Sequence, residues 1–390
     1  MKHMKHLILL SVAFMAFSCH GNSANDDNLT ITSKDTSSTI ASANSIKADT
    51  MGMHLSISSI NMAKAMVPGW NVGNTLEASG SETSWGNPKV TQALIDSVKK
   101  AGFKAIRIPV SWSYHFSDAT SYTISDTWKA RVAEVVNYAI KDGLYVIINI
   151  HWDGGWMDTP TYARQKTINT RLTTMWEQIA IYFRNYDSHL LFAGTNEVMM
   201  TNDYNAPTVE YYTVQNSFNQ TFVSTVRSTG GHNKYRALVV QGFNANIDYT
   251  VNYLTLPTDS TSDRLVVEDH YYDPYNFTLN TGTGYTTEWG KNATVHVDTW
   301  GQEDYADSQF AKLKAKYIDK GVPVIIGEYG AMARSNRLYY MQYISQSMKS
   351  HGLTPFVWDN GDTSGNGFGL FDRSTGAQKY PAIISAIVKQ

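Results

Sequence analysis

The sequence predicts a single (β/α)8 barrel (TIM barrel), and three observations carry this prediction. Eight short apolar runs, rich in β-branched or aromatic residues, recur between residues 69 and 360, and they end in polar residues. Helical patterns separate many of these runs, and several of the patterns stop at a glycine. Strands that are apolar throughout are typical of parallel sheets covered on both faces, and eight β/α units in one domain close a barrel.

The runs are expected to form the barrel strands in chain order. They are 69–75 (GWNVGNT), 105–112 (AIRIPVSW), 144–152 (LYVIINIHW), 190–197 (LLFAGTNE), 237–244 (ALVVQGFN), 264–272 (RLVVEDHYY), 322–329 (VPVIIGEY) and 354–360 (TPFVWDN). Helices are expected at 90–100, 128–141, 171–186, 211–228, 307–320 and 337–349. The glycines expected to end helices, because glycine readily adopts the left-handed conformation, are Gly102, Gly143, Gly230, Gly321 and Gly352.

Residues 1–18 have the layout of a secretory signal of the lipoprotein type. Residues 1–6 are basic, residues 7–17 form an apolar run too short to span a membrane, and Ser18 precedes Cys19. We expect Cys19 to be acylated, which would place the exported protein at the outer membrane or cell surface. Ordinary cleavage near Ala16 or Ser18 is the alternative, and it would give a secreted or periplasmic protein.

Residues 19–50 are predicted to be a flexible linker, and residues 51–390 the catalytic barrel domain. Residues 22–50 contain 11 Ser or Thr among 29 residues and no aromatic residue, so they cannot bury enough apolar surface to order themselves. From residue 51 onward the composition is even, without a low-complexity break or a repeat period.

The composition excludes several classes of function. The 32 Lys+Arg and 34 Asp+Glu leave a net charge of −2, so no basic surplus is available for a nucleic acid or an anionic membrane. We therefore expect no nucleic-acid partner, and membrane contact only through the lipid anchor. A single cysteine excludes a disulfide scaffold and a Cys-based zinc site, and the scattered histidines offer no metal-ligand spacing such as HExxH.

The barrel fold predicts where chemistry takes place, because active sites of this fold form at the carboxyl ends of the strands. The ends of the predicted strands carry polar and aromatic residues that would converge on one mouth of the barrel. They are Arg107, His151, Asn196, Glu197, His270, Tyr272, Glu328 and Trp358.

Glu197 and Glu328 end the fourth and seventh predicted strands, where their carboxylates can face each other across the barrel. Hydrolysis of a glycosidic bond needs two such carboxylates, one to protonate the leaving oxygen and one to attack or to activate water. At a separation of about 5–5.5 Å the second carboxylate attacks directly and the anomeric configuration is retained. Either glutamate alone is equally compatible with an ion pair at a strand end.

The motifs together resemble glycoside hydrolase family 5, in particular its bacterial endoglucanase and xyloglucanase branch. The residues that carry the resemblance are GWNVGNTLEA (69–78), ETSWGNP (82–88), AGFKAIRIPVSW (101–112), INIHWDGGW (148–156), GTNE (194–197), HYYDP (270–274), IIGEYG (325–330) and WDNG (358–361). The resemblance implies a retaining mechanism without a cofactor, with Glu197 as general acid/base and Glu328 as nucleophile.

The resemblance also implies roles around these glutamates. Arg107 matches the arginine that keeps the nucleophile ionised, and Tyr272 matches the tyrosine whose phenol donates a hydrogen bond to it. Asn196 matches the residue that hydrogen-bonds the sugar 2-hydroxyl. The remaining matches concern the sugar subsite: two lining histidines, an aromatic platform and a further sugar-binding asparagine, which correspond to His151, His270, Trp358 and Asn74.

Two positions depart from the family pattern. Glu197 is followed by Val198 where many relatives carry proline, which predicts a less rigid loop. His151 is followed by Trp152 where many carry a second histidine, which replaces a hydrogen-bonding group with an aromatic face for substrate binding. Further loop aromatics would line an open cleft that holds a polysaccharide chain: Trp85, Trp112, Trp156, Trp289, Trp300 and Phe368.

The sequence therefore predicts an endo-β-1,4-glucanase that acts on cellulose-type glucan, mixed-linkage β-glucan or a related plant polysaccharide. Within the same family, a xyloglucanase, a β-mannanase or glucomannanase, and a xylanase are alternatives that differ in loop shape. A non-catalytic glycan-binding protein at the cell surface is an alternative of another class, and it would keep the aromatics but lose a carboxylate.

Overall fold

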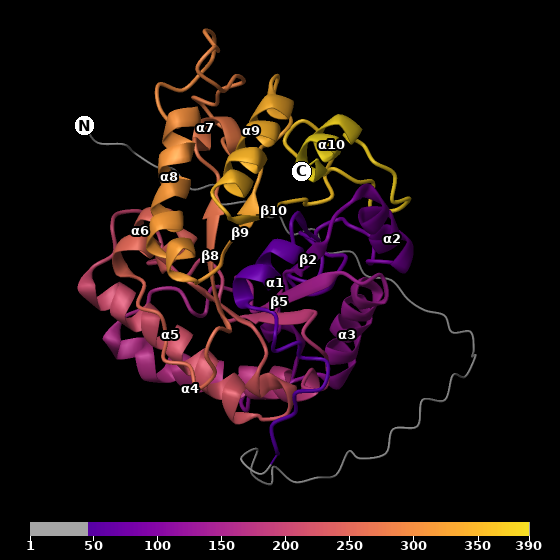
Figure 1. The fold of residues 1–390 in the computed structure, drawn as a ribbon, viewed down its shortest axis with the longest axis vertical. Coiled ribbons are helices and arrows are strands. Elements are labelled where there is room, and N and C mark those ends of the chain that lie inside the picture. The colour runs from indigo at the N-terminus through magenta and orange to yellow at the C-terminus, as the bar shows by residue number, and fades with distance from the viewer. Residues whose placement is uncertain (1–45, 390) are drawn as a thin grey trace, which may run out of the picture.

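The structure is a computed structural model that describes residues 46–389, and these residues form a closed parallel β-barrel surrounded by helices (Figure 1). The barrel strands follow one another in chain order, and the last strand pairs with the first. The predicted (β/α)8 architecture is confirmed. The predicted signal segment, Cys19 and most of the predicted linker lie outside the described residues.

Each barrel strand lies inside one of the eight predicted runs. The strands are β1 (Gly69–Asn71), β2 (Ala105–Ile108), β5 (Tyr145–Asn149), β6 (Leu190–Ala193), β7 (Leu238–Gln241), β8 (Leu265–Tyr271), β9 (Val324–Tyr329) and β10 (Thr354–Val357). Several strands end before the run does, so that the last residues of the run enter the following loop. The small hairpin β3 (Phe116–Asp118) and β4 (Thr123–Ile124) was not predicted.

The helices cover the outside of the barrel. The six that sequence patterns predicted are α2 (Gln92–Ala101), α3 (Asp126–Lys141), α4 (Tyr162–Tyr182), α5 (Val209–Ser228), α8 (Glu303–Lys316) and α9 (Arg337–Ser350). Four helices were not predicted: α1 (Ser59–Ala65), α6 (Ile247–Tyr253), α7 (Tyr275–Thr278) and α10 (Pro381–Val388). Short 3-10 turns are η2 (Ser113–His115), η3 (His232–Lys234), η4 (Phe243–Ala245) and η5 (Ile318–Lys320).

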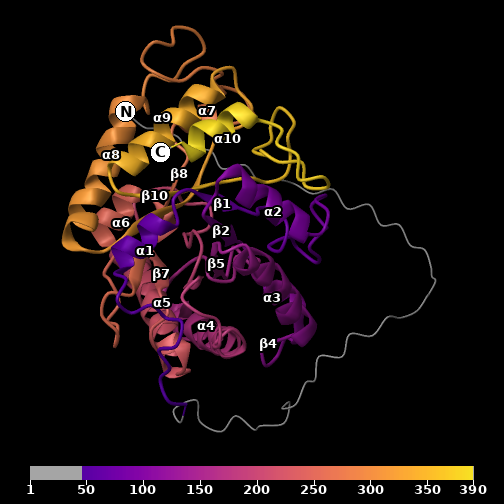
Figure 2. The ribbon, with the colours of Figure 1, turned by 45° about the vertical axis from the view of Figure 1, so that its right-hand side comes forward.

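The helix ends follow from local sequence. The N-terminus of α2 is capped by Thr91, whose side chain accepts a hydrogen bond from the Leu94 N–H, and its C-terminus is closed by Gly102 at a φ of 114°. All five glycines expected to end helices have positive φ. The last helix, α10, lies between α9 and α2 and so completes the ring of helices (Figure 2).

The apolar core has two layers. The outer layer lies between the strands and the surrounding helices and holds most of the buried apolar residues. The inner layer lies inside the barrel at the end where the strands begin, and α1 closes it: Met62 and Met66 pack there against Ile147, Leu191 and Phe356. Because this end is filled with apolar side chains, the polar residues inside the barrel collect at the opposite end, where the strands finish.

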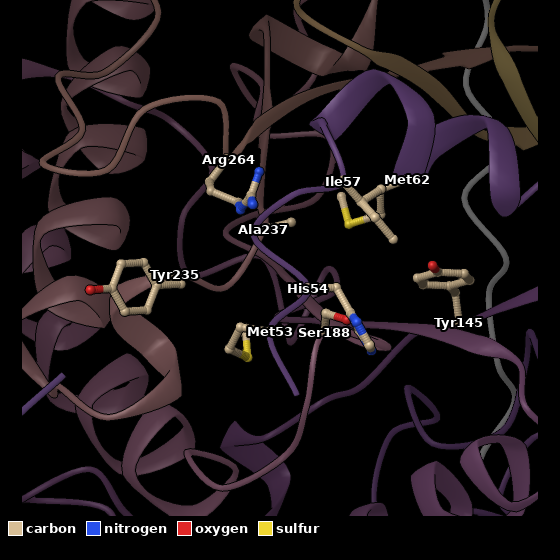
Figure 3. A pocket seen from close by; sticks show the side chains of 9 residues that line it. All are labelled: Met53, His54, Ile57, Met62, Tyr145, Ser188, Tyr235, Ala237 and Arg264. Atoms are coloured by element: carbon tan, nitrogen blue, oxygen red, sulfur yellow. The ribbon is translucent and has the colours of Figure 1, made fainter. Parts of the chain in front are cut away.

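A small pocket lies at the closed end of the barrel (Figure 3). Its lining includes Tyr145, Ala237 and Arg264, which stand at or just before the beginnings of β5, β7 and β8. The cavity measures about 10 Å³, about the volume that one water molecule needs, so it is too small for an organic ligand.

The first described residues already contact the barrel. Ala48 forms a β-bridge with Gly231, and the Asp49 carboxylate lies 3.2 Å from Nε2 of His232. The last residues of the predicted linker are therefore attached to the domain that follows. Among the residues that the structure describes, no helix has the length and apolar character needed to cross a membrane.

Candidate active site

Arg107 lies at the centre of a buried polar cluster at the carboxyl ends of the strands. It is fully buried, and its guanidinium donates hydrogen bonds to Glu328 at 2.9 Å, to Asn196 at 2.6 Å and to Asn71 at 3.1 Å. The guanidinium remains charged when buried and its planar fork contacts several oxygens at once. Arg107 therefore fixes side chains from three separate strand ends relative to one another.

Glu328 is aimed into the barrel by a β-bulge. Residues Asp269 and His270 of β8 oppose Ile326 and Glu328 of β9, so Gly327 is an extra residue in β9. A bulge of this kind turns the following side chain, and here it turns Glu328 toward Arg107. Its second oxygen, Oε2, accepts a hydrogen bond from the Tyr272 phenol at 3.1 Å, and its side chain is only 7% exposed.

Glu197 lies in the loop after β6 and is the more open of the two glutamates, with a side chain that is 43% exposed. Its backbone is in the left-handed region at a φ of 48°, which is unusual for a residue other than glycine and is typical of functional sites. The N–H of Glu197 donates to the Gln241 side chain at 2.9 Å, which holds this conformation. Its Oε1 lies 2.6 Å from Nδ1 of His270.

The two carboxylates face each other closely. One oxygen of Glu197, one oxygen of Glu328 and a ring nitrogen of His270 all lie within 4.8 Å of one another. Retaining glycosidases hold their two carboxyl groups about 5–5.5 Å apart, whereas inverting enzymes need a wider gap for a water molecule. The spacing therefore permits direct attack by one carboxylate, as a retaining mechanism requires.

The charges of the cluster shift the pKa values of its members. Burial acts to lower the pKa of His270, but Glu328, Glu197 and Glu268 outweigh burial and raise it to about 10. Burial raises the pKa of Glu328 above its ordinary value, although His270 and Arg107 attract its ionised form. Burial acts in the same way on Glu197, but there His270 and Arg107 prevail and the pKa lies below its ordinary value. The short His270–Glu197 contact thus holds one proton at neutral pH.

His151 and Trp358 form an aromatic wall beside the carboxylates. Their ring centroids are 6.1 Å apart and the ring planes differ by only 7°. Burial and the charges of Arg107 and His270 lower the pKa of His151 well below its ordinary value, so His151 is neutral. Trp358 follows β10 directly and packs over Gly73, where a Cβ atom would lie 2.6 Å from the indole ring.

A cation-binding role for the cluster is disfavoured by its own charges. Within residues 46–389, Glu197, Glu328 and His270 are the one group of ligand-type side chains close enough together to hold a metal ion. The Arg107 guanidinium already contacts Glu328 at 2.9 Å, and a proton on His270 Nδ1 blocks the nitrogen that a metal would need. The arrangement suits acid–base and nucleophilic chemistry on an uncharged substrate.

Comparison with known proteins identifies the family of the chain. A family model described as cellulase (glycosyl hydrolase family 5) matches residues 71–364. The chain belongs to glycoside hydrolase family 5. It is 40% identical to endoglucanase A of Paenibacillus barcinonensis, over 88% of this chain and 93% of that protein.

Solved structures of family 5 agree in fold. The Bacteroides ovatus GH5 xyloglucanase, solved in complex with a XXXG heptasaccharide, superposes with a TM-score of 0.84 at 42% identity, over 88% of this chain and 78% of that one. A GH5-4 broad specificity endoglucanase from Bacteroides salanitronis superposes with a TM-score of 0.80 at 38% identity, over 85% of this chain and 94% of that one. The protein is thus a retaining glycoside hydrolase of the endoglucanase type.

Most of the family 5 residues predicted from sequence meet at this site, but Asn74 does not join the cluster through the contacts observed. Asn74 lies in the loop after β1, where its backbone N–H donates to the Glu77 carboxylate and its carbonyl accepts from Asn87 at 2.9 Å. It is Asn71, at the end of β1, that contacts Arg107.

The predicted loop aromatics divide into exposed, half-buried and buried groups. Trp156 and Trp300 are half-buried. Trp152 is 50% exposed and Trp85 is 42% exposed, so both are available to a ligand. Trp112 is fully buried and Trp289 is 1% exposed, so the expectation that these two line the cleft is wrong; both belong to the core. Phe368 is also buried and packs edge-on against the Tyr272 ring.

Val198, which stands where many relatives carry proline, packs into the core. It is buried at 1% exposure, and its carbonyl accepts a hydrogen bond from the Asn244 N–H at 2.9 Å. The lower rigidity expected for this loop stays a prediction.

Buried polar residues of the barrel strands that were not predicted as part of the site include Asn71, Gln241 and Glu268. All three are buried and contact the side chains or backbone of the predicted site residues. Glu268 had a visible signal. A charged residue in the middle of an apolar strand shares its face with the residues two and four positions on, which are His270 and Tyr272.

Proposed function

We propose that the protein hydrolyses internal β-1,4-glucosidic bonds by double displacement, with Glu328 as nucleophile and Glu197 as general acid/base. The approach of the two carboxylates to within 4.8 Å is the observation that carries the proposal. The asymmetry of their surroundings supports the division of roles. Glu328 is buried between two hydrogen-bond donors, whereas Glu197 is more exposed and can reach a leaving group.

In the first step, an oxygen of Glu328 attacks the anomeric carbon while Glu197 donates a proton to the glycosidic oxygen, and the C–O bond to the leaving chain breaks. Arg107 and Tyr272 each hold one oxygen of Glu328 and so orient it for attack. The products are a covalent glycosyl–enzyme and a released chain end.

In the second step, Glu197 removes a proton from a water molecule, whose oxygen attacks the anomeric carbon and displaces Glu328. The water approaches from the face that the leaving chain has vacated, so the two inversions give net retention. Each catalytic group returns to its starting protonation state.

The proton for the first step is stored in the Glu197–His270 pair. Because the pKa of His270 is raised to about 10 and that of Glu197 is lowered, the proton rests on Nδ1 in the free enzyme. A distance of 2.6 Å to Oε1 lets the proton pass to Glu197 as the leaving oxygen draws it away.

Azide rescue tests the two roles. Glu328→Ala is expected to lose hydrolysis of an activated aryl cellobioside, and added azide is expected to restore turnover and give the inverted α-azide, because azide occupies the place of the missing carboxylate. Glu197→Ala is expected to form the glycosyl–enzyme from the same substrate and to give the retained β-azide. Products are identified by NMR.

Glu134→Ala serves as the matched control. Glu134 lies on α3 with a half-exposed carboxylate, so the substitution removes the same atoms away from the site. The control is expected to match the wild-type enzyme and to form no azide adduct. An α-azide from Glu197→Ala, or near-normal turnover by Glu328→Ala, would overturn the assignment.

For the natural substrate we propose soluble, unbranched β-glucans whose backbone contains β-1,4-linked glucose. Similarity to the Bacteroides ovatus xyloglucanase favours branched xyloglucan as a second candidate. Rates on barley β-glucan, xyloglucan, glucomannan and xylan distinguish the two. A preference for xylan or glucomannan over both glucans would contradict the proposal.

We also propose export and acylation at Cys19. The basic residues 1–6, the apolar run 7–17 and the cysteine that follows support this proposal. Expression with labelled palmitate, followed by membrane fractionation, is expected to recover a labelled protein in the membrane fraction, and Cys19→Ala is expected to leave it unlabelled. An unlabelled wild-type protein would contradict acylation.

A further inference from the structure

A third carboxylate, that of Glu268, lies beneath the two proposed catalytic glutamates. Glu268 is on β8 and is fully buried inside the barrel. Its Oε1 forms an ion pair with Nε of Arg107 at 2.9 Å and lies 3.3 Å from Nε2 of His270. One carboxylate oxygen thus contacts both cations of the site.

The neighbouring strand makes room for this carboxylate. A Cβ atom at Gly327 would lie 1.9 Å from Oε1 of Glu268, so only glycine is compatible with the observed position. Gly327 is the bulge residue that turns Glu328 into the site. The same backbone feature therefore aims Glu328 and accommodates Glu268.

Glu268 connects the two halves of the site through contacts that form a continuous series. On one side, Arg107 contacts both Glu268 and Glu328, each at 2.9 Å. On the other side, His270 contacts Glu268 at 3.3 Å and Glu197 at 2.6 Å. The proposed nucleophile and the proposed acid are therefore both linked to the buried carboxylate of Glu268, Glu328 through Arg107 and Glu197 through His270.

The net charge of the cluster depends on this anion. With Glu268 ionised, three carboxylates face two cations, Arg107 and protonated His270, which leaves one negative charge in excess. Without it, two carboxylates would balance the two cations. An excess negative charge in a buried site favours the proton-bound forms of its neighbours.

Other groups act on His270 and Glu268 from the surrounding strands. Those that face them are Arg107 from β2, His151 after β5, Glu197 after β6, Gln241 from β7, Asp269 and Tyr272 on the same strand and loop, and Glu328 from β9. Of these, Arg107 opposes proton binding by His270, and the carboxylates favour it. Because the Glu268 carboxylate contacts Arg107 directly, it also partly offsets the positive charge with which Arg107 disfavours protonation of His270.

We propose that Glu268 is a positioning residue of the hydrolytic reaction: its buried carboxylate holds Arg107 and His270 together and sets the pH range in which the enzyme is active. The proposal rests on the proposed roles of Glu197 and Glu328.

The direction of the effect follows from the sign of the charge. Loss of the negative charge at Glu268 lowers the pKa of Glu328, which must be ionised to attack, and lowers the pKa values of Glu197 and His270, which must hold the acid proton. Both limbs of the pH profile of kcat/KM therefore move to lower pH. Charges this close shift a pKa by about one to three units, so the alkaline limb is expected to move by about one pH unit or more.

The test is the pH dependence of kcat/KM for Glu268→Gln on an aryl cellobioside. Glutamine keeps the shape of the side chain and removes its charge. Glu268→Asp keeps the charge and is expected to restore the wild-type limbs at a reduced rate. Circular dichroism over the same pH range confirms that the variants stay folded.

Glu82→Gln is the matched control. Glu82 is also buried, but it lies in the loop between β1 and α2, where its carboxylate accepts hydrogen bonds from Arg131 and from the Val90 N–H. The same acid-to-amide change there is expected to leave both limbs in place. A Glu268→Gln profile that loses height but keeps its limbs would overturn the proposal, because a merely structural residue would behave in this way.

If Glu268→Gln does not fold, the protonation state of the His270 ring is measured instead, in the wild-type enzyme and in Glu268→Asp. With 13C-labelled histidine, the ring is expected to remain protonated at pH 8 in both. Titration of His270 near its ordinary value in the wild type would overturn the proposal. Failure of the proposed function would appear separately, as a wild-type enzyme that does not hydrolyse the aryl cellobioside.

Discussion

Replacement of Tyr272 by Phe is expected to weaken the nucleophile without disturbing the fold. The change removes only the phenol oxygen, which donates to Oε2 of Glu328 at 3.1 Å, while the ring keeps its edge-on contact with Phe368 at a centroid distance of 6.1 Å. A hydrogen bond to an ionised acceptor contributes about 1.5–3 kcal/mol. Each 1.36 kcal/mol corresponds to about a tenfold change in rate, so kcat/KM is expected to fall about ten- to a hundredfold.

The pH profile provides a second readout of the same change. The phenol stabilises the ionised form of Glu328, so its loss raises the pKa of this carboxylate further above its ordinary value. The nucleophile is active only above that pKa, and the acid limb of kcat/KM therefore moves to higher pH. Kinetics with an aryl cellobioside across the pH range measure both effects, and thermal unfolding is expected to change by no more than about two degrees. A loss of less than threefold with an unmoved acid limb would refute the assigned role.

The remaining predictions concern the substrate wall and the wild-type pH profile. Trp358→Ala is expected to reduce kcat/KM at least tenfold with little change in thermal stability, and an equal loss of both would indicate a structural plug. Gly73→Ala is expected to reduce kcat/KM as well, because its Cβ would lie 2.6 Å from the Trp358 ring and displace it. Trp152→Ala is expected to raise KM for polysaccharide several-fold while kinetics on an aryl cellobioside stay near the wild-type values, since the ring is 50% exposed. In the wild-type enzyme the acid limb of kcat/KM is expected at a pH above the ordinary glutamate pKa, because burial raises the pKa of Glu328; an acid limb below pH 4 in steady-state kinetics would contradict this.

The secondary structure was predictable where the signal is local. All eight strands fall within their predicted apolar runs, because a strand buried on both faces requires apolar residues throughout. The helices that were missed, such as α6 and α7, are short, and α10 is itself a short apolar segment that begins with Pro381. Helix α4 begins at Tyr162, ahead of the predicted start at residue 171, because its first turns are polar and exposed and so carry no apolar period.

The meeting of Glu197 and Glu328 was also predictable, since strand ends of a barrel meet at one mouth. Loop aromatics were less so, because a tryptophan next to a strand end can turn outward like Trp152 or into the core like Trp112. That choice depends on packing against residues distant in the sequence. Asn71 and Gln241 were missed for a related reason: inside an apolar run, an amide carries no indication of which face it occupies until the strand register is known.

The sequence alone determined the fold class, the family and which residues are able to carry out chemistry, because strand period, helix stops and sequence motifs are local properties of the chain. Tertiary structure decided how those residues act together. Only closure of the sheet, with an extra residue at Gly327, aims Glu328 at Arg107 and leaves space for Glu268 beneath them. The electrostatic balance of the site arises from contacts between six strand ends, and no single segment of the chain encodes it.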